Sequence, residues 1–374
     1  MNNTPVAIDL FCGVGGLSLG FEEAGFHVAL AVDRNPLHAG LHLINFPDTP
    51  VLCADIQTVR GDDLRVRAGI GNRHVSVVMG GPPCQGFSVG GARSASDPRN
   101  ALVFDFMRVV EELKPSYFVM ENVPGILDPR YAPILESVLR TASRLGYHVD
   151  HPFWLLNAAD FGVPQRRRRT FVVGSLAGML RPMMPVGLAR PVTVGQALRD
   201  LYVVEERPER IRDGQYFGAL GKASAYSLRL RRSSSEPPAP LSGFFPTEHT
   251  RATVKRFSKV KPGDYEAVSR FYRLEEAGVS PTLRAGTGVE RGKFMAPRPI
   301  HPVYDRCIHV REAARLHSFP DRFQFHEAKW HAFMQIGNSV PPLLSQAVGD
   351  SIMSALRASA CRKASHHESR RLAR

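Results

Sequence analysis

Short apolar runs alternate with helical patterns through the first half of the chain, and this alternation limits the folds that are available. Runs such as Val6–Phe11 and Val75–Met79 are rich in β-branched residues and have the length of buried strands. Segments with helical periodicity lie between such runs, for example Gly16–Ala24 and Leu102–Leu113. The pattern predicts an α/β fold with a Rossmann-like, mixed but mostly parallel sheet and helices on both faces.

The alternation stops near residue 188, where the composition changes. Residues 190–280 are richer in Arg, Ser, Pro and aromatic residues, and their periodicity is weak. Helical patterning returns at 311–317 and 343–356. We therefore predict one domain over 1–188 and 333–360, a smaller domain with a hinge over 189–332, and a disordered basic tail over 361–374.

The chain is strongly basic, with 48 Lys and Arg residues, 35 Asp and Glu residues and a net charge of +13. Such an excess favours a polyanionic partner such as nucleic acid. Basic residues cluster between Arg207 and Arg232 and again, with no acid between them, from Arg251 to Lys261. Solvated surface charge is the alternative, but clustering in one part of the chain favours phosphate contacts.

The five cysteines are widely spaced and form no Cys-x-x-Cys pair, which argues against a disulfide framework and a structural zinc site. Neither a membrane-spanning apolar run nor a signal-peptide pattern is present in the sequence. We expect a cytoplasmic protein with reduced thiols, no metal and no membrane partner. Four of the cysteines are expected to be inert: Cys12, Cys53, Cys307 and Cys361.

The fifth cysteine stands in an unusual setting. Cys84 follows two prolines in the segment Gly80-Gly81-Pro82-Pro83-Cys84-Gln85-Gly86-Phe87-Ser88, at the end of an apolar run. Proline cannot continue a strand ladder, so the chain must turn there. The carboxyl ends of strands are where open α/β sheets bind their ligands. A small buried thiol in a turn is the alternative, because free cysteine is usually buried.

A glycine-rich turn joins the first predicted strand to the first predicted helix, in the segment Asp9–Gly16. Glycines allow close backbone approach to a ligand, and the helix amino terminus favours negative groups. The spacing differs from G-x-G-x-x-G, so NAD is not predicted. Asp33 and Asp55 follow the next two strands, where acids accept hydrogen bonds from ribose. Each acid alone is more often a helix cap, but the three features together predict a nucleoside cofactor.

Six segments occur in an order that resembles the DNA (cytosine-5)-methyltransferase family, of the bacterial restriction-modification type. The resemblance covers residues 5–175 and 280–355, and Pro-Pro-Cys-Gln and Gln-x-Arg-x-Arg are its specific parts. The six segments are Asp9–Gly16, Gly81–Ser88, Glu121–Val123, Gln165–Arg169, Pro281–Arg284 and Gly337–Pro342.

The resemblance implies catalytic roles for four residues. Cys84 would add to carbon 6 of cytosine and make carbon 5 nucleophilic. Glu121 would contact ring nitrogen 3 and the exocyclic amine. Arg167 and Arg169 would hold the base oxygen and the active-site loop. The target base must leave the helix, and residues 90–96 would close over it as a lid.

The resemblance also implies a cofactor and partners. The cofactor is S-adenosylmethionine, with its adenine near Phe11 or Ile56 and its ribose held by Asp33. The partners are double-stranded DNA, read by residues 190–280, and a cognate restriction endonuclease, with the chain acting as a monomer. The full set of expected cofactor residues is Phe11, Gly13, Gly15, Gly16, Asp33, Asp55, Ile56, Leu102, Asn338 and Val340.

Three alternative functions fit the sequence less well. A relative that methylates transfer RNA would have a reduced recognition region, which the basic residues 190–280 argue against. A non-catalytic DNA-binding relative would not need Cys84, Glu121, Arg167 and Arg169 together. A nicotinamide oxidoreductase is disfavoured by the glycine spacing.

Overall fold

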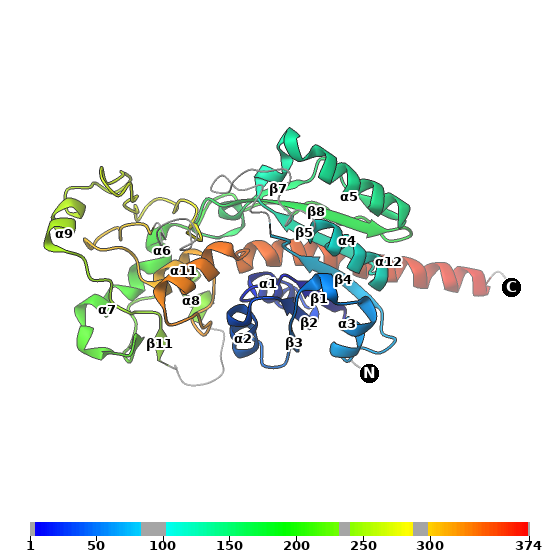
Figure 1. The fold of residues 1–374 in the computed structure, drawn as a ribbon, viewed down its shortest axis with the longest axis horizontal. Coiled ribbons are helices and arrows are strands. Elements are labelled where there is room, and N and C mark those ends of the chain that lie inside the picture. Colours follow the sequence, from blue (N-terminus) through cyan, green and yellow to red (C-terminus); the bar gives the residue numbers. More distant parts are fainter. Residues whose placement is uncertain (1–3, 84–101, 232–239, 287–297, 373–374) are drawn as a thin grey trace. The chain divides into compact units, whose positions relative to one another are not determined.

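The structure is a computed structural model, and it describes residues 4–83, 102–231, 240–286 and 298–372 (Figure 1). The chain divides into two compact units. Unit 1 comprises Met1–Leu156, Arg168–Val186 and Leu344–Arg374, and unit 2 comprises Asn157–Arg167 and Gly187–Leu343. The smaller domain that we predicted over 189–332 thus corresponds to a unit that also takes in residues 157–167, 187–188 and 333–343.

Unit 1 is built on an eight-stranded sheet with the order β3-β2-β1-β4-β5-β8-β6, in which β7 also pairs with β8. Strands β1 to β5 run parallel, and β8 is antiparallel to both β5 and β6. The predicted mixed, mostly parallel sheet is therefore confirmed. The strands are β1 (Val6–Leu10), β2 (His27–Asp33), β3 (Val51–Cys53), β4 (Val75–Gly80), β5 (Tyr117–Asn122), β6 (Tyr147–Val149), β7 (Trp154–Asn157) and β8 (Arg168–Leu176).

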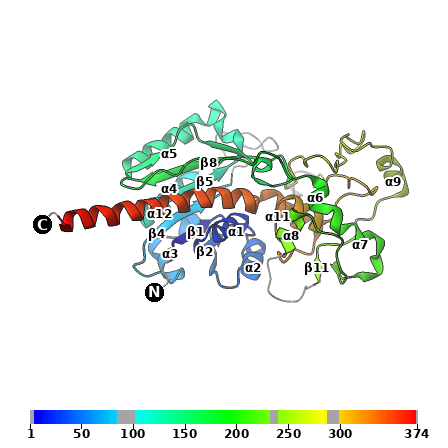
Figure 2. The same cartoon turned by 180° about the vertical axis from the view of Figure 1, so that it is seen from behind.

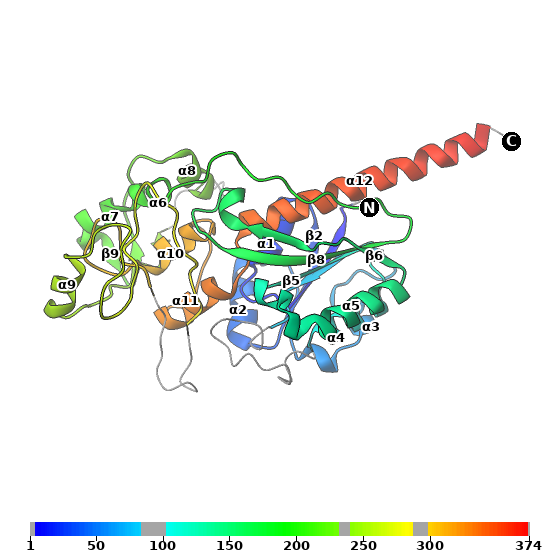
Figure 3. The same ribbon diagram turned by 90° about the horizontal axis from the view of Figure 1, so that it is seen from above.

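Helices cover both faces of this sheet, with α1 and α12 on one face and α3, α4 and α5 on the other (Figure 3). The apolar positions of α4 point inward, with Val103, Phe106 and Val110 fully buried against the strands. The helices of this unit are α1 (Gly16–Glu23), α2 (Pro36–Asn45), α3 (Gly61–Arg67), α4 (Leu102–Leu113), α5 (Ala132–Arg144) and α12 (Pro342–Leu372), with short 3-10 turns η1 (Ile56–Thr58), η3 (Pro124–Leu127) and η4 (Pro129–Tyr131).

Small residues let α12 pack closely against α1. A Cβ added to Gly20 would lie 2.4 Å from the Cβ of Ser345, so no larger residue fits there. The Ser345 hydroxyl donates a hydrogen bond to the Leu17 carbonyl over 2.8 Å. A helix from the end of the chain is thus fixed onto the first helix of the chain.

The carboxyl end of α12 corrects one prediction. The tail expected to be disordered from residue 361 continues as helix to Leu372 (Figures 1 and 2). Residues 358–372 contain neither Gly nor Pro and are rich in Ala, Arg and Ser. An established helix propagates through such residues at little cost, so basic composition alone did not predict disorder correctly.

Unit 2 consists of short elements joined by long loops, with a three-stranded sheet of order β11-β10-β9. None of the helices that the structure describes, in either unit, combines the length and apolarity that a membrane span requires. The elements are η5 (Ala158–Phe161), α6 (Val194–Leu198), η6 (Arg199–Leu201), α7 (Val203–Glu206), η7 (Pro208–Arg210), β9 (Ile211–Arg212), β10 (Gln215–Tyr216), α8 (Ala225–Arg231), β11 (Leu241–Ser242), α9 (Arg251–Phe257), α10 (Val310–Leu316) and α11 (Lys329–Asn338).

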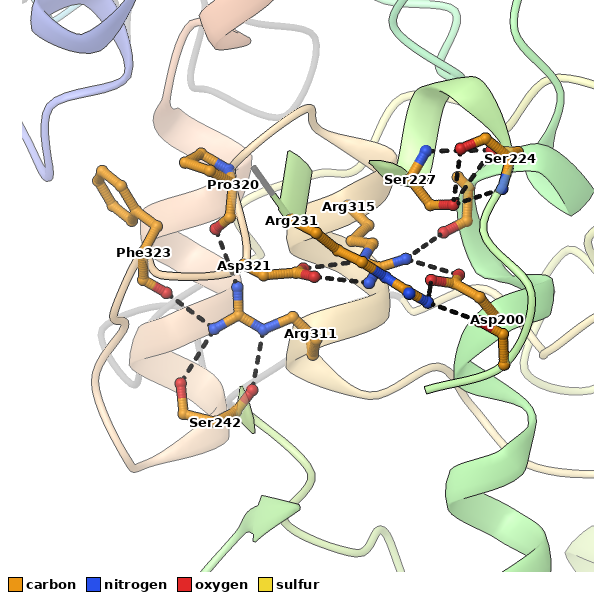
Figure 4. A network of polar contacts seen from close by, with 12 residues as sticks. Asp200, Ser224, Ser227, Arg231, Ser242, Arg311, Arg315, Pro320, Asp321 and Phe323 are labelled. Atoms are coloured by element: carbon orange, nitrogen blue, oxygen red, sulfur yellow. Dashed lines mark hydrogen bonds and ion pairs between the residues drawn. The ribbon is translucent and has the colours of Figure 1, made fainter. Parts of the chain in front are cut away.

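Buried arginines hold the interior of unit 2 together (Figure 4). Arg315 is fully buried between two carboxylates, with 2.6 Å from its guanidinium to Asp200 and 2.6 Å to Asp321. Asp200 also pairs with Arg231. Arg311 donates hydrogen bonds to the backbone carbonyls of Ser242, Pro320 and Phe323. Some of the basic residues in this region are therefore bound to internal partners and cannot face a partner molecule.

Candidate functional site

The glycine-rich turn after β1 has a left-handed backbone at three positions. Phe11 has a φ of 61°, Gly13 of 55° and Gly15 of 101°. A Cβ on Gly15 would lie 2.2 Å from the Phe46 ring, so this position requires glycine. At Gly13 a Cβ would meet nothing within 4 Å, so open space lies beside the turn. Gly16 is the first residue of α1.

Three buried polar side chains lie under this turn. The Ser18 hydroxyl donates to Asp9 Oδ2 over 2.6 Å and lies 3.0 Å from His42 Nε2. Because the hydroxyl proton goes to Asp9, we assign the Nε2–H tautomer to His42. Burial raises the pKa of Asp9 to about 7 and lowers the pKa of His42 to about 4. Asp9 Oδ1 has no hydrogen-bond partner among the described residues. Sequence reasoning missed Ser18 and His42, which carried no signal beyond their helical spacing.

Asp33 ties the turn to the end of β2. Its Oδ2 accepts a hydrogen bond from the Gly13 N–H over 2.9 Å, and its Oδ1 accepts one from the Asn35 N–H over 2.8 Å. Burial acts to raise the pKa of Asp33, but His38 and these N–H donors outweigh it and hold the pKa below its usual value. Asp33 is therefore an ionised carboxylate beside the open space at Gly13.

Three further expected cofactor residues follow the next strands. Asp55 and Ile56 come after β3, and Leu102 is the first residue of α4. Asp55 caps η1 by accepting the Gln57 N–H over 3.1 Å. Ile56 and Leu102 are buried in the main hydrophobic core, and Phe11 packs partly buried against the same core. Arg108 of α4 donates to the Ile56 carbonyl over 2.7 Å and so holds η1 in place. Ile56 and Leu102 thus belong to the main hydrophobic core of unit 1, and Phe11 packs against that core.

Glu121 and Arg169 form an ion pair where β5 and β8 meet. Arg169 Nε lies 2.7 Å from Glu121 Oε1, and each side chain is 11% exposed. A Cβ on Gly81 would lie 2.9 Å from Glu121 Oε2, so the backbone after β4 passes directly beside the carboxylate. The Asn122 side chain donates to the Pro82 carbonyl over 3.4 Å. Cys84 and the expected lid over residues 90–96 lie outside the described residues, between Pro83 and Leu102.

Arg167 belongs to unit 2 and is buried there. Its guanidinium donates to three backbone carbonyls, those of Leu283 at 3.0 Å, Gly337 at 2.6 Å and Ser339 at 2.9 Å. A Cβ on Gly337 would lie 2.4 Å from the Ala285 nitrogen, so the two backbones cross without side chains between them. Arg167 therefore clamps two segments that are far apart in sequence.

Gln165 and His317 complete this clamp. Gln165 accepts the Leu283 N–H over 3.1 Å and donates to His317 Nδ1 over 3.0 Å. His317 Nε2 lies 3.0 Å from the Ser339 carbonyl, to which it donates. The Gln-x-Arg-x-Arg motif did not indicate this role for Gln165, and the only sequence signal at His317 is the end of a helical pattern.

The last two expected cofactor residues also lie in unit 2. Asn338 is the exposed last residue of α11, and Val340 is buried two residues later. Their contribution to a cofactor site stays a prediction.

Two of the cysteines that we expected to be inert are buried. Burial raises the pKa of the Cys12 thiol well above its usual value, and Asp9 and Asp33 add to the effect. Burial also raises the pKa of Cys307 to about 11. Neither thiol forms a thiolate readily, as nucleophilic chemistry requires. Among the residues that the structure describes, no three His, Cys, Asp or Glu side chains gather to hold a metal ion.

A family model for C-5 cytosine-specific DNA methylases matches residues 6–354. The chain belongs to this family. Its substrate is therefore cytosine in DNA and its methyl donor is S-adenosylmethionine. The match spans both units, and it favours DNA over the transfer RNA alternative.

Relatives among the C-5 cytosine-specific methylases span nearly the whole chain. The type II methyltransferase M.XorII of Xanthomonas oryzae pv. oryzae is 48% identical, over 94% of this chain and 85% of that protein. The type II methyltransferase M.DdeI of Desulfomicrobium norvegicum is 32% identical, over 92% and 88%. A prophage-encoded putative DNA modification methyltransferase from E. coli superposes with a TM-score of 0.80 at 32% identity, over 95% and 100%. The Dnmt2 methyltransferase of S. pombe, at 16% identity and a TM-score of 0.58, shares the fold alone.

The residues around the glycine-rich turn fit S-adenosylmethionine. Open space at Gly13 and the ionised Asp33 beside it provide room and an acceptor for a cationic nucleoside. The half-buried Phe11 adds an aromatic side chain at the same turn. The family's cofactor and the chemistry of these residues therefore agree.

Proposed function

We propose that the chain methylates carbon 5 of cytosine within a specific sequence of double-stranded DNA through a covalent adduct on Cys84. The Cys84 thiolate forms a bond to carbon 6, and the ring becomes an enamine that is nucleophilic at carbon 5. S-adenosylmethionine supplies the methyl group. Loss of the carbon 5 proton to a base then expels the Cys84 thiolate and restores the ring.

Glu121 and Arg169 act on the base. The observation that carries this proposal is the 2.7 Å ion pair at the end of β5, beside the backbone of Gly81 that leads to Cys84. Glu121 contacts ring nitrogen 3 as charge develops there, and Arg169 fixes the orientation of the carboxylate. A guanidinium in this position also suits the carbonyl oxygen of cytosine.

Arg167 acts as a positioning residue. Its three bonds to backbone carbonyls leave its guanidinium committed to the fold of unit 2. It holds the segment that carries Asn338 and Val340, which we propose reach S-adenosylmethionine. The other cofactor residues are Phe11, Gly13, Gly15, Gly16, Asp33, Asp55, Ile56 and Leu102.

We further propose a restriction-modification role. The type II names of M.XorII and M.DdeI support it. The chain would act as a monomer on DNA of the cytoplasmic nucleoid. The methyl groups that it adds would protect that DNA from a cognate endonuclease. Residues 190–280 would choose the sequence.

Trapping on a modified base tests the mechanism. DNA with 5-fluorocytosine at the target is expected to form a stable covalent complex, because fluorine cannot leave as a proton does. The complex should be absent in Cys84→Ser, while S-adenosylmethionine binding, measured by calorimetry, is retained. Methyl transfer by Cys84→Ser at the wild-type rate would contradict the covalent mechanism. Bisulfite sequencing of DNA from expressing cells would show the methylated sequence.

A further inference from the structure

Unit 2 contains a short hairpin whose tip is exposed to solvent. Backbone hydrogen bonds join Gly263 to Arg273 over 3.0 Å and Glu266 to Phe271 over 2.8 Å, and Tyr265 pairs with Tyr272 as an antiparallel bridge. We call residues 263–273 the hairpin and residues 267–270 its tip. Val268 at the tip is 71% exposed, and Tyr265 is 59% exposed.

Hydrogen bonds to the Glu266 side chain fix the conformation of the tip. The Glu266 carboxylate accepts hydrogen bonds from the backbone N–H groups of Val268 and Ser269 and from the Ser269 hydroxyl. Its other oxygen pairs with Arg256 Nε over 3.1 Å. Arg273, at the base of the hairpin, donates to the Phe257 carbonyl over 2.8 Å and pairs with Asp305. The hairpin is thus fixed at both ends, which suits a recognition element.

The tip carries a strained arginine. Arg270 is exposed and has a φ of 59°, in the left-handed region that non-glycine residues seldom occupy. Such strain persists only where the surrounding contacts enforce it, and it concentrates at functional positions. Glu266 enforces it here, since its backbone carbonyl accepts the Arg270 N–H over 2.9 Å.

The described segment 251–273, which carries the tip, has an excess of exposed positive charge. Glu266 is buried and paired, so Asp264 is the one exposed carboxylate in the described segment 251–273. Against it stand five exposed cations, none of them in a described ion pair: Arg251, Lys255, Lys259, Lys261 and Arg270. Because the buried arginines of this unit are committed to internal carboxylates and carbonyls, this segment is a concentrated source of exposed positive charge.

We infer that the tip enters a groove of the DNA and reads base edges, with Arg270 contacting a guanine and α9 contacting phosphates. This assignment rests on the proposed function and names the reading residues within it. A two-stranded ribbon fits the major groove, and a bidentate arginine–guanine contact is the commonest specific one there. The exposed Val268 offers an apolar contact to a thymine methyl. Lys255 and Lys259 add charge without sequence information.

A randomised duplex library, methylated in vitro and read by bisulfite sequencing, tests the assignment. The variant Arg270→Gly removes the guanidinium and suits the left-handed backbone, so it does not disturb the turn. We expect it to reduce the preference for one base pair by about 10- to 100-fold and to leave the other positions unchanged. Lys259→Ala removes the same charge and is the matched control. It should weaken all sites evenly and lower the slope of log affinity against log salt by about 1.

The outcomes separate the two levels of the proposal. Unchanged base preferences in Arg270→Gly, or an even loss like that of Lys259→Ala, would overturn the assignment of the tip and leave the methyltransferase proposal standing. A wild-type chain that methylates no duplex in the library would overturn both. Thermal unfolding and S-adenosylmethionine binding, each expected to match the wild type, would show that Arg270→Gly is folded.

Discussion

Arg169 and Glu121 meet across two antiparallel strands, with 2.7 Å between Arg169 Nε and Glu121 Oε1. The pair lies at the point where the backbone after β4 passes the Glu121 carboxylate. Since β5 and β8 both belong to unit 1, one rigid sheet orients the two side chains. Arg169 therefore directs Glu121 without a flexible loop between them.

Arg169→Ala is expected to slow methyl transfer while the protein stays folded. Loss of the guanidinium frees Glu121 to change rotamer and removes a positive group near the base, which costs roughly 10²- to 10³-fold in turnover. Single-turnover transfer of labelled methyl groups measures the rate. Arg168→Ala is the matched control, because Arg168 is exposed and should retain near wild-type rates. Equal losses in the two variants would rule out a specific role for the ion pair.

Arg167→Met is expected to destabilise the protein. It keeps the volume but leaves the carbonyls of Leu283, Gly337 and Ser339 without the donor, at about 1–3 kcal/mol for each buried group. Urea unfolding should show a lower midpoint than the wild type. Arg166→Ala, at an exposed neighbour, should change stability by less than about 0.5 kcal/mol. A midpoint unchanged in Arg167→Met would contradict the clamp.

Asp9 is expected to give stability a distinct pH dependence. Its pKa is about 7 in the folded chain against an ordinary value of 3.8, so between these pH values the folded state holds a proton that the unfolded state has released. Stability should therefore fall as pH rises from about 4 to 7, by at most about 1.4 kcal/mol per unit, and level off above. Asp9→Asn should lose this component, and the exposed Asp62→Asn should retain it. Urea unfolding curves across this pH range, recorded without cofactor, measure the free energy of unfolding. The same pH dependence in Asp9→Asn as in the wild type would contradict the prediction.

Gly15→Ala is expected to weaken S-adenosylmethionine binding sharply. The new Cβ would lie 2.2 Å from the Phe46 ring and would hold a left-handed backbone, so the turn must shift. Gly13→Ala shares the backbone strain, about 1 kcal/mol, but meets open space on the protein side. Calorimetric titration with S-adenosylhomocysteine gives the affinity of each variant. Comparing the two affinities separates the effect of backbone strain from that of the Phe46 clash. Adding Phe46→Leu to Gly15→Ala should recover part of the affinity. If it does not, the contact with Phe46 is not the cause of the loss.

The sheet of unit 1 was predictable because its order comes from local patterns. Each strand from Val6 to Tyr117 is a short apolar run with a helix after it, and right-handed crossovers then leave few arrangements. The glycine-rich turn and Asp33 were predictable for the same reason, since strand ends share one edge. Family resemblance, not pattern, singled out Glu121 and Arg169, whose ion pair the structure shows.

The clamp and the interior of unit 2 could not be predicted from local patterns. Gln165, Arg167 and His317 bind segments more than a hundred residues away, and no periodicity marks such contacts. Arginine is usually found at the surface, but Arg311 and Arg315 are buried. Backbone carbonyls and carboxylates bind their guanidinium groups inside the protein. Arginine counts alone therefore overstate the charge available to DNA.

The packing of α12 on α1 has a consequence for synthesis of the chain. Gly20 in the first helix meets Ser345, more than three hundred residues later, and Ser345 bonds to Leu17. A nascent chain therefore exposes that face of α1 until nearly the whole protein has left the ribosome. A stop codon before residue 342 would remove this cover permanently, and we expect such a product to be held by chaperones or degraded.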